Sequence, residues 1–209
     1  MNSKSRAGEV WKEIKPFAIR DLLHGIKKSS ISAGDEYSIL LYKTTGKKLK
    51  KYSVTEEGLS AALSASSSGD VVFLPSSTIS GNFTVPAGVA LAGLSGKNAI
   101  LTGQIALSNE SSLENLTVDR DEASYGAIFG VVDSGGGTSY IKGCTIDVAN
   151  SLGAAYAVYL SNGGSFYIYD SNLLALTGSD GYAGVVTTGI LFQIGGRAKG
   201  TVSLMPYNY

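Results

Sequence analysis

The sequence predicts an all-β protein of 209 residues whose main part is a parallel β-helix. One observation is a short pattern (an apolar residue, two variable residues, then an apolar or small residue) that recurs every 20–28 residues. This period is too short for repeats of paired helices and suits one coil of a β-solenoid. The other is that Gly, Asn, Asp and Ser interrupt short runs rich in Val, Ile, Thr and Tyr, as expected for short strands joined by turns.

The composition excludes several other classes of protein. Apolar residues make up 44% of the chain, which is enough for a folded core. A single Cys and a single His argue against a disulfide framework and a zinc site. The apolar runs are shorter than a membrane span, and the first 25 residues lack the apolar block of a secretory signal. We therefore expect no membrane insertion.

The charges divide the chain into two parts. Residues 1–55 contain 12 basic and 5 acidic residues, whereas residues 56–209 contain 5 basic and 12 acidic ones. This asymmetry predicts a basic N-terminal module, residues 1–54, and a β-helix body, residues 55–209. In the module we expect a helix over Phe17–Ile26, which follows Pro16. Two strand-like runs, 36–42 and 47–54, flank a glycine-containing turn and predict a β-hairpin.

The body begins with a predicted capping helix. Residues 55–63 have Thr55 as a suitable N-cap, two glutamates in the first turn, and one apolar side. That side is formed by Leu59, Ala62 and Leu63. The first strand follows at Val71–Leu74 and ends before Pro75. The helix is expected to cover the open end of the β-helix.

The aligned repeats predict about six coils. They start at Val71, Leu91, Leu113, Ile141, Ile168 and Leu191. Equivalent residues of successive coils should stack about 4.8 Å apart. The predicted inward stacks are Leu113/Ile141/Ile168, Leu116/Cys144/Ser171 and Val118/Ile146/Leu173, and the outward stack is Thr117/Thr145/Asn172. A bend that needs small residues or a left-handed backbone is expected at Asn115, Gly143 and Asp170.

Two segments near the start of the body carry a family resemblance. Residues 69–75 (GDVVFLP) and 84–93 (TVPAGVALAG), preceded by a short Leu/Ala helix, resemble the opening of pectin-lyase-like right-handed β-helices. The resemblance covers roughly residues 55–200 and implies a right-handed coil. It does not select a function, because this fold serves lyases, hydrolases, phage tailspikes and inert fibres.

The N-terminal part carries a second resemblance. The order Asp21-Leu22, Gly34-Asp35, Lys47–Tyr52 and Leu59 resembles an element near the N-terminus of phage tail-fibre and virion-appendage proteins. It implies that residues 1–54 attach to other virion proteins and that the chain forms a homotrimer. The expected location is the virion, assembled in a host cytoplasm, which agrees with the lack of a disulfide framework.

The candidate residues for chemistry are acidic. Polygalacturonase-like enzymes combine clustered Asp residues with Gly-His-Gly, but the one His, His24, precedes the body. Pectate-lyase-like enzymes use carboxylate-bound Ca²⁺ and a cationic base. The densest carboxylate cluster comprises Asp119, Asp121, Glu122 and, one coil later, Asp147. Either it binds Ca²⁺ or acts as a carboxylate pair, or it is a solvated loop. We favour the loop and expect no metal, cofactor or catalytic residue.

Exposed aromatic and basic residues are the candidates for binding. Tyr156, Tyr159, Tyr167 and Tyr169 suit a contact with a host surface glycan, a subunit interface or simple packing, and we favour the interface. Lys47, Lys48, Lys50 and Lys51 suit either attachment to an acidic protein surface or a solvated edge that blocks strand addition. Aromatic residues do not interleave with them on a sheet face, so we do not expect nucleic-acid binding.

These observations favour a non-catalytic fibre or appendage protein of a phage-like virion. Its N-terminal module would attach to the particle, and its β-helix would form the shaft or the receptor-facing part. The alternative is a carbohydrate-active β-helix, either a polysaccharide lyase or a glycan-binding domain. The sequence leaves open whether the chain is an enzyme and favours the view that it is not.

Overall fold

The computed structural model describes residues 37–94, 98–177, 181–186 and 190–200. The chain divides into two compact units, Met1–Ala33 and Gly34–Tyr209, and all the described residues belong to the second. The helix expected over Phe17–Ile26 therefore lies outside the described residues. So do His24 and the pairs Asp21-Leu22 and Gly34-Asp35.

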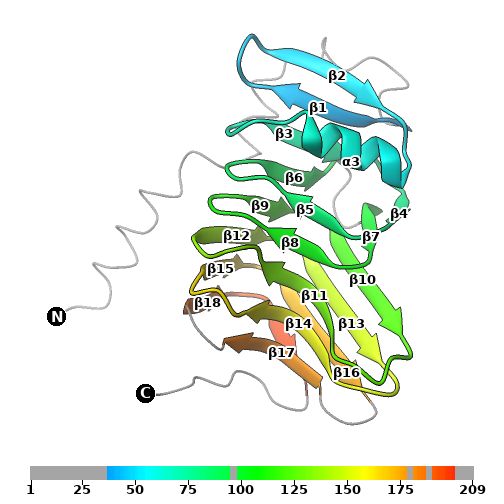
Figure 1. Cartoon of the computed structure of the whole chain (residues 1–209), viewed down its shortest axis with the longest axis vertical. Coiled ribbons are helices and arrows are strands. Elements are labelled where there is room, and N and C mark those ends of the chain that lie inside the picture. The colour runs from blue at the N-terminus through cyan, green and yellow to red at the C-terminus, as the bar shows by residue number, and fades with distance from the viewer. Residues whose placement is uncertain (1–36, 95–97, 178–180, 187–189, 201–209) are drawn as a thin grey trace, which may run out of the picture. The chain divides into compact units, whose positions relative to one another are not determined.

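The second unit is a parallel β-helix with three sheets, which confirms the predicted fold class (Figure 1). The first sheet contains β3 (Val71–Leu74), β6 (Ala90–Gly93), β9 (Ser112–Glu114), β12 (Thr138–Lys142), β15 (Ser165–Tyr169) and β18 (Ile190–Ile194). The second sheet contains β4 (Thr78–Ser80), β7 (Ile100–Thr102), β10 (Thr117–Glu122), β13 (Thr145–Asn150), β16 (Asn172–Thr177) and β19 (Arg197–Lys199). The third sheet contains β5 (Phe83–Val85), β8 (Ile105–Leu107), β11 (Ile128–Asp133), β14 (Ala155–Leu160) and β17 (Gly181–Val186).

The chain visits the three sheets in turn, so each coil contributes one strand to each sheet. Within the described ranges this gives complete coils from β3 to β17, after which β18 and β19 begin another. The number of complete coils is thus smaller than the six expected. The difference arises because the described part of the last aligned repeat has strands in only two of the three sheets.

The predicted inward stacks are confirmed. Ile141 pairs with both Leu113 and Ile168, and Ile146 pairs with both Val118 and Leu173; these side chains are fully buried. Leu116, Cys144 and Ser171 form the third stack, also fully buried. Outside the coil, Thr145 pairs with Thr117 and Asn172, as expected for the outward stack. Apolar columns along the coil therefore form the core.

The predicted bend is also confirmed. Asn115, Gly143 and Asp170 have φ angles of 53°, 62° and 49°, and Gly195 continues the column with φ 70°. All four lie in the left-handed region, which costs little for Gly and is tolerated by Asn and Asp. A Cβ atom at Gly143 would also lie 2.7 Å from Oδ1 of Asn115 in the preceding coil. The bend is thus a column of left-handed residues between the first and second sheets.

The first and last repeats are aligned differently from the sequence prediction. Val72, not Val71, pairs with Leu91, and Gln193, not Leu191, pairs with Ile168. Leu191 instead lies opposite Phe166. The first error arises because residues 71–74 are all apolar, so alternation does not reveal which of them point inward.

The predicted hairpin and capping helix are both present. β1 (Ile39–Lys43) and β2 (Lys48–Tyr52) pair antiparallel, and β1 also pairs antiparallel with β3. The hairpin therefore continues the first sheet of the β-helix. α3 (Glu56–Ser64) begins at the N-cap Thr55, whose hydroxyl accepts a hydrogen bond from the Gly58 N–H at 3.1 Å. Its residues Leu59, Ala62 and Leu63 belong to the core.

A buried carboxylate fastens the hairpin to the first coil. Asp70 is only 2% exposed. It accepts hydrogen bonds from Lys43 Nζ at 2.8 Å, Ser67 N–H at 2.8 Å and Thr44 N–H at 3.0 Å. Burial alone would raise the pKa of Asp70, but these hydrogen bonds and the charge of Lys43 together lower it.

Candidate functional site

An aromatic ladder runs along the outside of the third sheet. Phe129 of β11, Tyr156 of β14 and Tyr182 of β17 are aligned in successive coils. Their ring centroids are 5.1 Å apart in both steps, and the rings are inclined by only 20° and 9°. Tyr159 packs beside them, 4.8 Å from the Phe129 ring and 5.6 Å from the Tyr156 ring. We call these four residues the third-sheet ladder.

A second ladder runs along the outside of the first sheet. Tyr140, Tyr167 and Phe192 are aligned, with 5.9 Å between successive ring centroids. We call these three residues the first-sheet ladder. Tyr169 lies on the same strand as Tyr167, opposite Ile194, and is 7% exposed. Its burial, and then the neighbouring Tyr140 and Tyr167, raise the pKa of its hydroxyl.

The coil spacing determines what these rings present to a partner. Strands of successive coils lie about 4.8 Å apart, which is close to the stacking distance of aromatic rings. Tyr156, in the middle of the third-sheet ladder, therefore has neighbouring rings stacked against both of its faces. Tyr167 has the Tyr140 ring stacked on one side and the Phe192 ring, tilted by 55°, on the other. The edges and hydroxyls of these rings are what remain for other molecules. This arrangement favours packing or protein contact over stacking on a sugar ring.

The four tyrosines predicted from the sequence fall into two groups. Tyr156 and Tyr159 belong to the third-sheet ladder, and Tyr167 and Tyr169 lie on the first sheet. Sequence reasoning did not include Phe129 and Phe192 among the candidate residues. Phe129 lies between the buried Ile128 and Gly130, so strand alternation could have indicated that it faces outward. Only the alignment of successive coils shows that it stacks on Tyr156.

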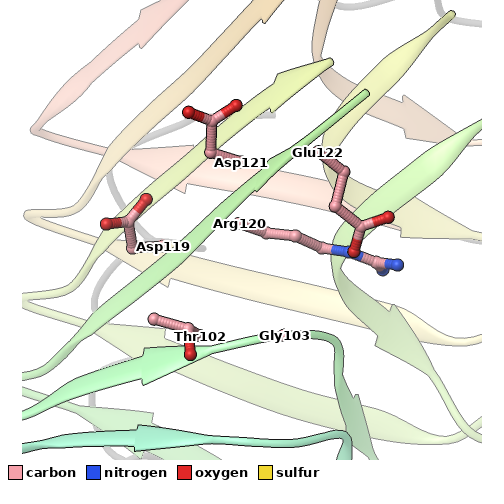
Figure 2. A pocket seen from close by; sticks show the side chains of 6 residues that line it. All are labelled: Thr102, Gly103, Asp119, Arg120, Asp121 and Glu122. Carbon is pink, nitrogen blue, oxygen red and sulfur yellow. The ribbon is translucent and has the colours of Figure 1, made fainter. Parts of the chain in front are cut away.

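The acidic cluster lies on the second sheet. Asp119 and Asp147 are paired across β10 and β13. In Figure 2, Asp119 and Asp121 project to one side of β10, whereas the side chains of Arg120 and Glu122 lie together on the other side. A pocket of about 320 Å³ is lined by Thr102, Gly103, Asp119, Arg120, Asp121 and Glu122. The four predicted carboxylates are therefore neighbours on the same two strands, but they point in two directions.

The one cation of this pocket has its own contacts. Arg120 Nε donates to Glu122 Oε1 at 2.7 Å, and Arg120 Nη1 donates to the Phe129 carbonyl oxygen at 2.9 Å. The second of these bonds joins the end of β10 to β11. A guanidinium also keeps its proton in proteins, which makes it a poor base without special activation. The geometry thus gives Arg120 a structural role at this corner.

The carboxylates repel one another. Burial raises the pKa of Asp147, and the nearby charges of Asp119 and Asp121 raise it further. Among the described residues, no group of three or more His, Cys, Asp or Glu side chains is placed to hold a metal ion. This part of the chain also has no helix that is long and apolar enough to cross a membrane.

The predicted attachment residues lie on the hairpin. Lys47, Lys48, Lys50 and Lys51 are all exposed, at the turn and along β2, which is the last strand of the first sheet at this end. Lys50 Nζ lies 4.8 Å from the centre of the Tyr52 ring. The lysines therefore line a sheet edge, and their role in attachment stays a prediction.

No family model, curated protein or solved structure matches this chain. The resemblances to pectin-lyase-like β-helices and to virion appendages depend on the residues quoted for them. The structure supports a parallel β-helix, and the function is argued below from its surfaces.

Proposed function

We propose that the chain is a non-catalytic structural subunit of a fibre or appendage of a phage-like virion. Residues 1–54 attach it to other virion proteins, and the β-helix forms the shaft or the receptor-facing part. The observation that supports this proposal is the pair of outward aromatic ladders. Ring edges and tyrosine hydroxyls are well suited to subunit interfaces, where aromatic residues are enriched.

The repeat of the ladders also favours lateral contact between copies of this chain. Each ladder has a column with one ring per coil: Phe129, Tyr156 and Tyr182 with centroids 5.1 Å apart on the third sheet, and Tyr140, Tyr167 and Phe192 with centroids 5.9 Å apart on the first. A second β-helix lying parallel to the first has the same coil spacing, so its side chains can contact the ring edges and hydroxyls coil by coil along the whole ladder. In this proposal the copies form a homotrimer held together by these faces.

The native mass of the full chain tests this assembly. Light scattering coupled to size exclusion should give three chain masses for the wild type. Tyr159→Lys should shift the mass toward one chain, because it replaces one ladder ring by a charge and leaves the stacked column of Phe129, Tyr156 and Tyr182 in place. The matched control is Tyr125→Lys, at a loop position that is 90% exposed and outside both ladders. A monomeric wild type, or equal masses for the two variants, would contradict the proposal.

The alternative function is carbohydrate-active, and the pocket beside Asp119 and Asp121 favours it. A lyase or a glycan-binding domain would use this pocket and the adjacent Asp147. The test is cleavage and binding of acidic polysaccharides by the full chain, compared with Asp119→Ala. Unchanged cleavage by the variant would rule out Asp119 as part of the active site. No cleavage by the wild type would rule out the hypothesis that the chain is an enzyme.

A further inference from the structure

The three sheets present very different outward surfaces. From β10 onward, the outward positions of the second sheet carry five charged residues: Asp119, Asp121, Asp147, Arg197 and Lys199. The first-sheet strands that carry the ladder, β12, β15 and β18, contain one charged residue, Lys142. The third-sheet strands β11, β14 and β17 contain only Asp133, which is buried. The two faces with aromatic ladders are therefore depleted of charge, as the cores of subunit interfaces are.

The two ladders also run along the same coils. Along the chain the stacked rings alternate between the third and the first sheet, in the order Phe129, Tyr140, Tyr156, Tyr167, Tyr182 and Phe192. Each coil advances along the axis by about 4.8 Å, so every third-sheet ring lies within one coil of the first-sheet ring that follows it. Two parallel copies at the same height can therefore bring the third-sheet ladder of one against the first-sheet ladder of the other.

The corner that these two faces share is built from small residues. The chain passes from the third to the first sheet through residues 134–137 (SGGG) and, one coil later, residues 161–164 (SNGG). Gly135 and Gly163 have φ angles of 107° and 75°, which explains the choice of glycine. A Cβ atom at either position would meet nothing within 4 Å. The corner therefore has no bulky side chains, and several copies of it can approach a common axis closely.

We propose that three parallel copies of this chain form a closed ring in which the third-sheet ladder of each copy packs against the first-sheet ladder of the next. The glycine-containing corner lies at the three-fold axis, and the charged second sheet faces outward. This arrangement rests on the function proposed above and specifies how the trimer is built. Unlike faces must meet, because a contact between identical faces joins two copies and not three. Copies in a ring stand at the same height, so the faces that meet must match coil by coil, as the two ladders do.

Charge complementarity at the outer rim supports the same pairing of faces. Lys142 ends β12, at the edge of the first sheet farthest from the glycine-containing corner, and it is exposed without an ion pair among the described residues. Glu122 ends β10 beside the start of the third sheet, where Arg120 contacts both Glu122 and Phe129. Its side chain is 42% exposed. In the ring Lys142 therefore comes near Glu122 of the partner subunit, and such rim charges align the two faces.

Cysteines at two corners of one coil distinguish this ring from other trimers. Ser161 is exposed and directly follows β14, at the corner that the ring places on the axis. Ser151 is also exposed and directly follows β13, at the corner between the second and third sheets. Serine-to-cysteine substitutions keep the size of the side chain, so the two variants are matched. The native Cys144 is fully buried and does not contribute.

The probe is a bifunctional maleimide that spans about 10 Å, the spacing of packed sheets. In the dilute full chain, Ser161→Cys should give a covalent pair of chains at least about tenfold faster than Ser151→Cys, because the ring raises the effective concentration of its thiols. A denaturing gel measures this. If the native mass is three chains but Ser151→Cys cross-links as fast, the ring is overturned and the proposed function stands. A monomeric native mass would overturn both.

Mixed trimers test whether unlike faces meet. Lys142→Cys and Glu122→Cys place a thiol at the outer rim of the first and the third face, and both leave the ladders intact. In the ring, identical rim residues lie far apart, so neither variant alone should cross-link rapidly. Trimers refolded from a mixture of the two variants should do so. Rapid cross-linking of either variant alone, or none in a mixture whose native mass is three chains, would overturn the pairing.

Discussion

At the scale of single residues, the clearest contribution to stability is that of Asp70. Its carboxylate receives four hydrogen bonds: one from Lys43 at the end of β1, two from the N–H and the hydroxyl of Thr44 in the hairpin turn, and one from the Ser67 N–H in the loop after α3. Among the described residues, few carboxylates are buried so completely. The residue therefore joins the capping hairpin to the first coil, which sequence analysis did not anticipate because its partners are 26 and 27 residues away.

We predict that Asp70→Asn destabilises the protein by about 1–3 kcal/mol at pH 7, because the amide nitrogen replaces an oxygen that accepts two hydrogen bonds. The folded-state pKa of Asp70 is lowered, so its stabilisation is complete above the unfolded value of about 3.9. It is lost as the pH falls through the folded pKa. The difference in urea unfolding free energy between wild type and variant should therefore be constant at neutral pH and shrink below about pH 4. The exposed Glu110→Gln is the control and should show neither effect.

At the scale of elements, the left-handed bend determines where the second sheet begins in each coil. Residues before the bend belong to the first sheet and residues after it to the second, in each coil from Asn115 onward. The neighbouring coils are linked there by backbone bonds, for example from the Asn115 N–H to the Lys142 carbonyl at 2.9 Å. The bend thus keeps the strands on both sides aligned.

We predict that Gly143→Ala costs about 1–2 kcal/mol, because alanine resists the left-handed conformation that Gly143 adopts at φ 62°. Gly143→Asn adds a Cβ atom as well, but asparagine tolerates this conformation, as Asn115 does one coil earlier. Chemical unfolding should show that Gly143→Asn loses less unfolding free energy than Gly143→Ala. Equal losses would mean that the added Cβ atom, and not the backbone angle, is the cause.

At the scale of the whole β-helix, burial decreases toward the last coil. Leu173 of β16 is fully buried, whereas Ala198, which pairs with it in β19, is exposed. The stability of a solenoid is roughly the sum of contacts between neighbouring coils, and among the described strands β18 and β19 have a neighbour on one side only. The final coil is therefore the least stabilised part of the described structure.

We predict a gradient of hydrogen exchange along the β-helix. Backbone amides of β12 and β15 should exchange slowly, and those of β18 and β19 several orders of magnitude faster in a monomer, because local opening there breaks fewer contacts. Exchange followed by mass spectrometry measures this.

The sequence predicted the parts of this fold that repeat. The stacks through Ile141 and Ile146 were identified because residues 113–119 and 141–147 match position by position. The ladders and the Arg120 contact could not be predicted in the same way. Ring stacking depends on which residues of distant coils are aligned, and the acceptor of Arg120 is the Phe129 backbone carbonyl, which no side-chain pattern encodes.

The left-handed column has a consequence for how such a chain changes over evolution. Asn115, Gly143, Asp170 and Gly195 follow one another at intervals of 28, 27 and 25 residues, yet the strands beside them remain aligned. Differences in length are therefore absorbed at the other corners of the coil. Insertions and deletions there change surface loops, such as the one after Glu122, without moving the core columns. A lineage with this architecture is free to replace its exposed loops while the β-helix that carries them is inherited unchanged.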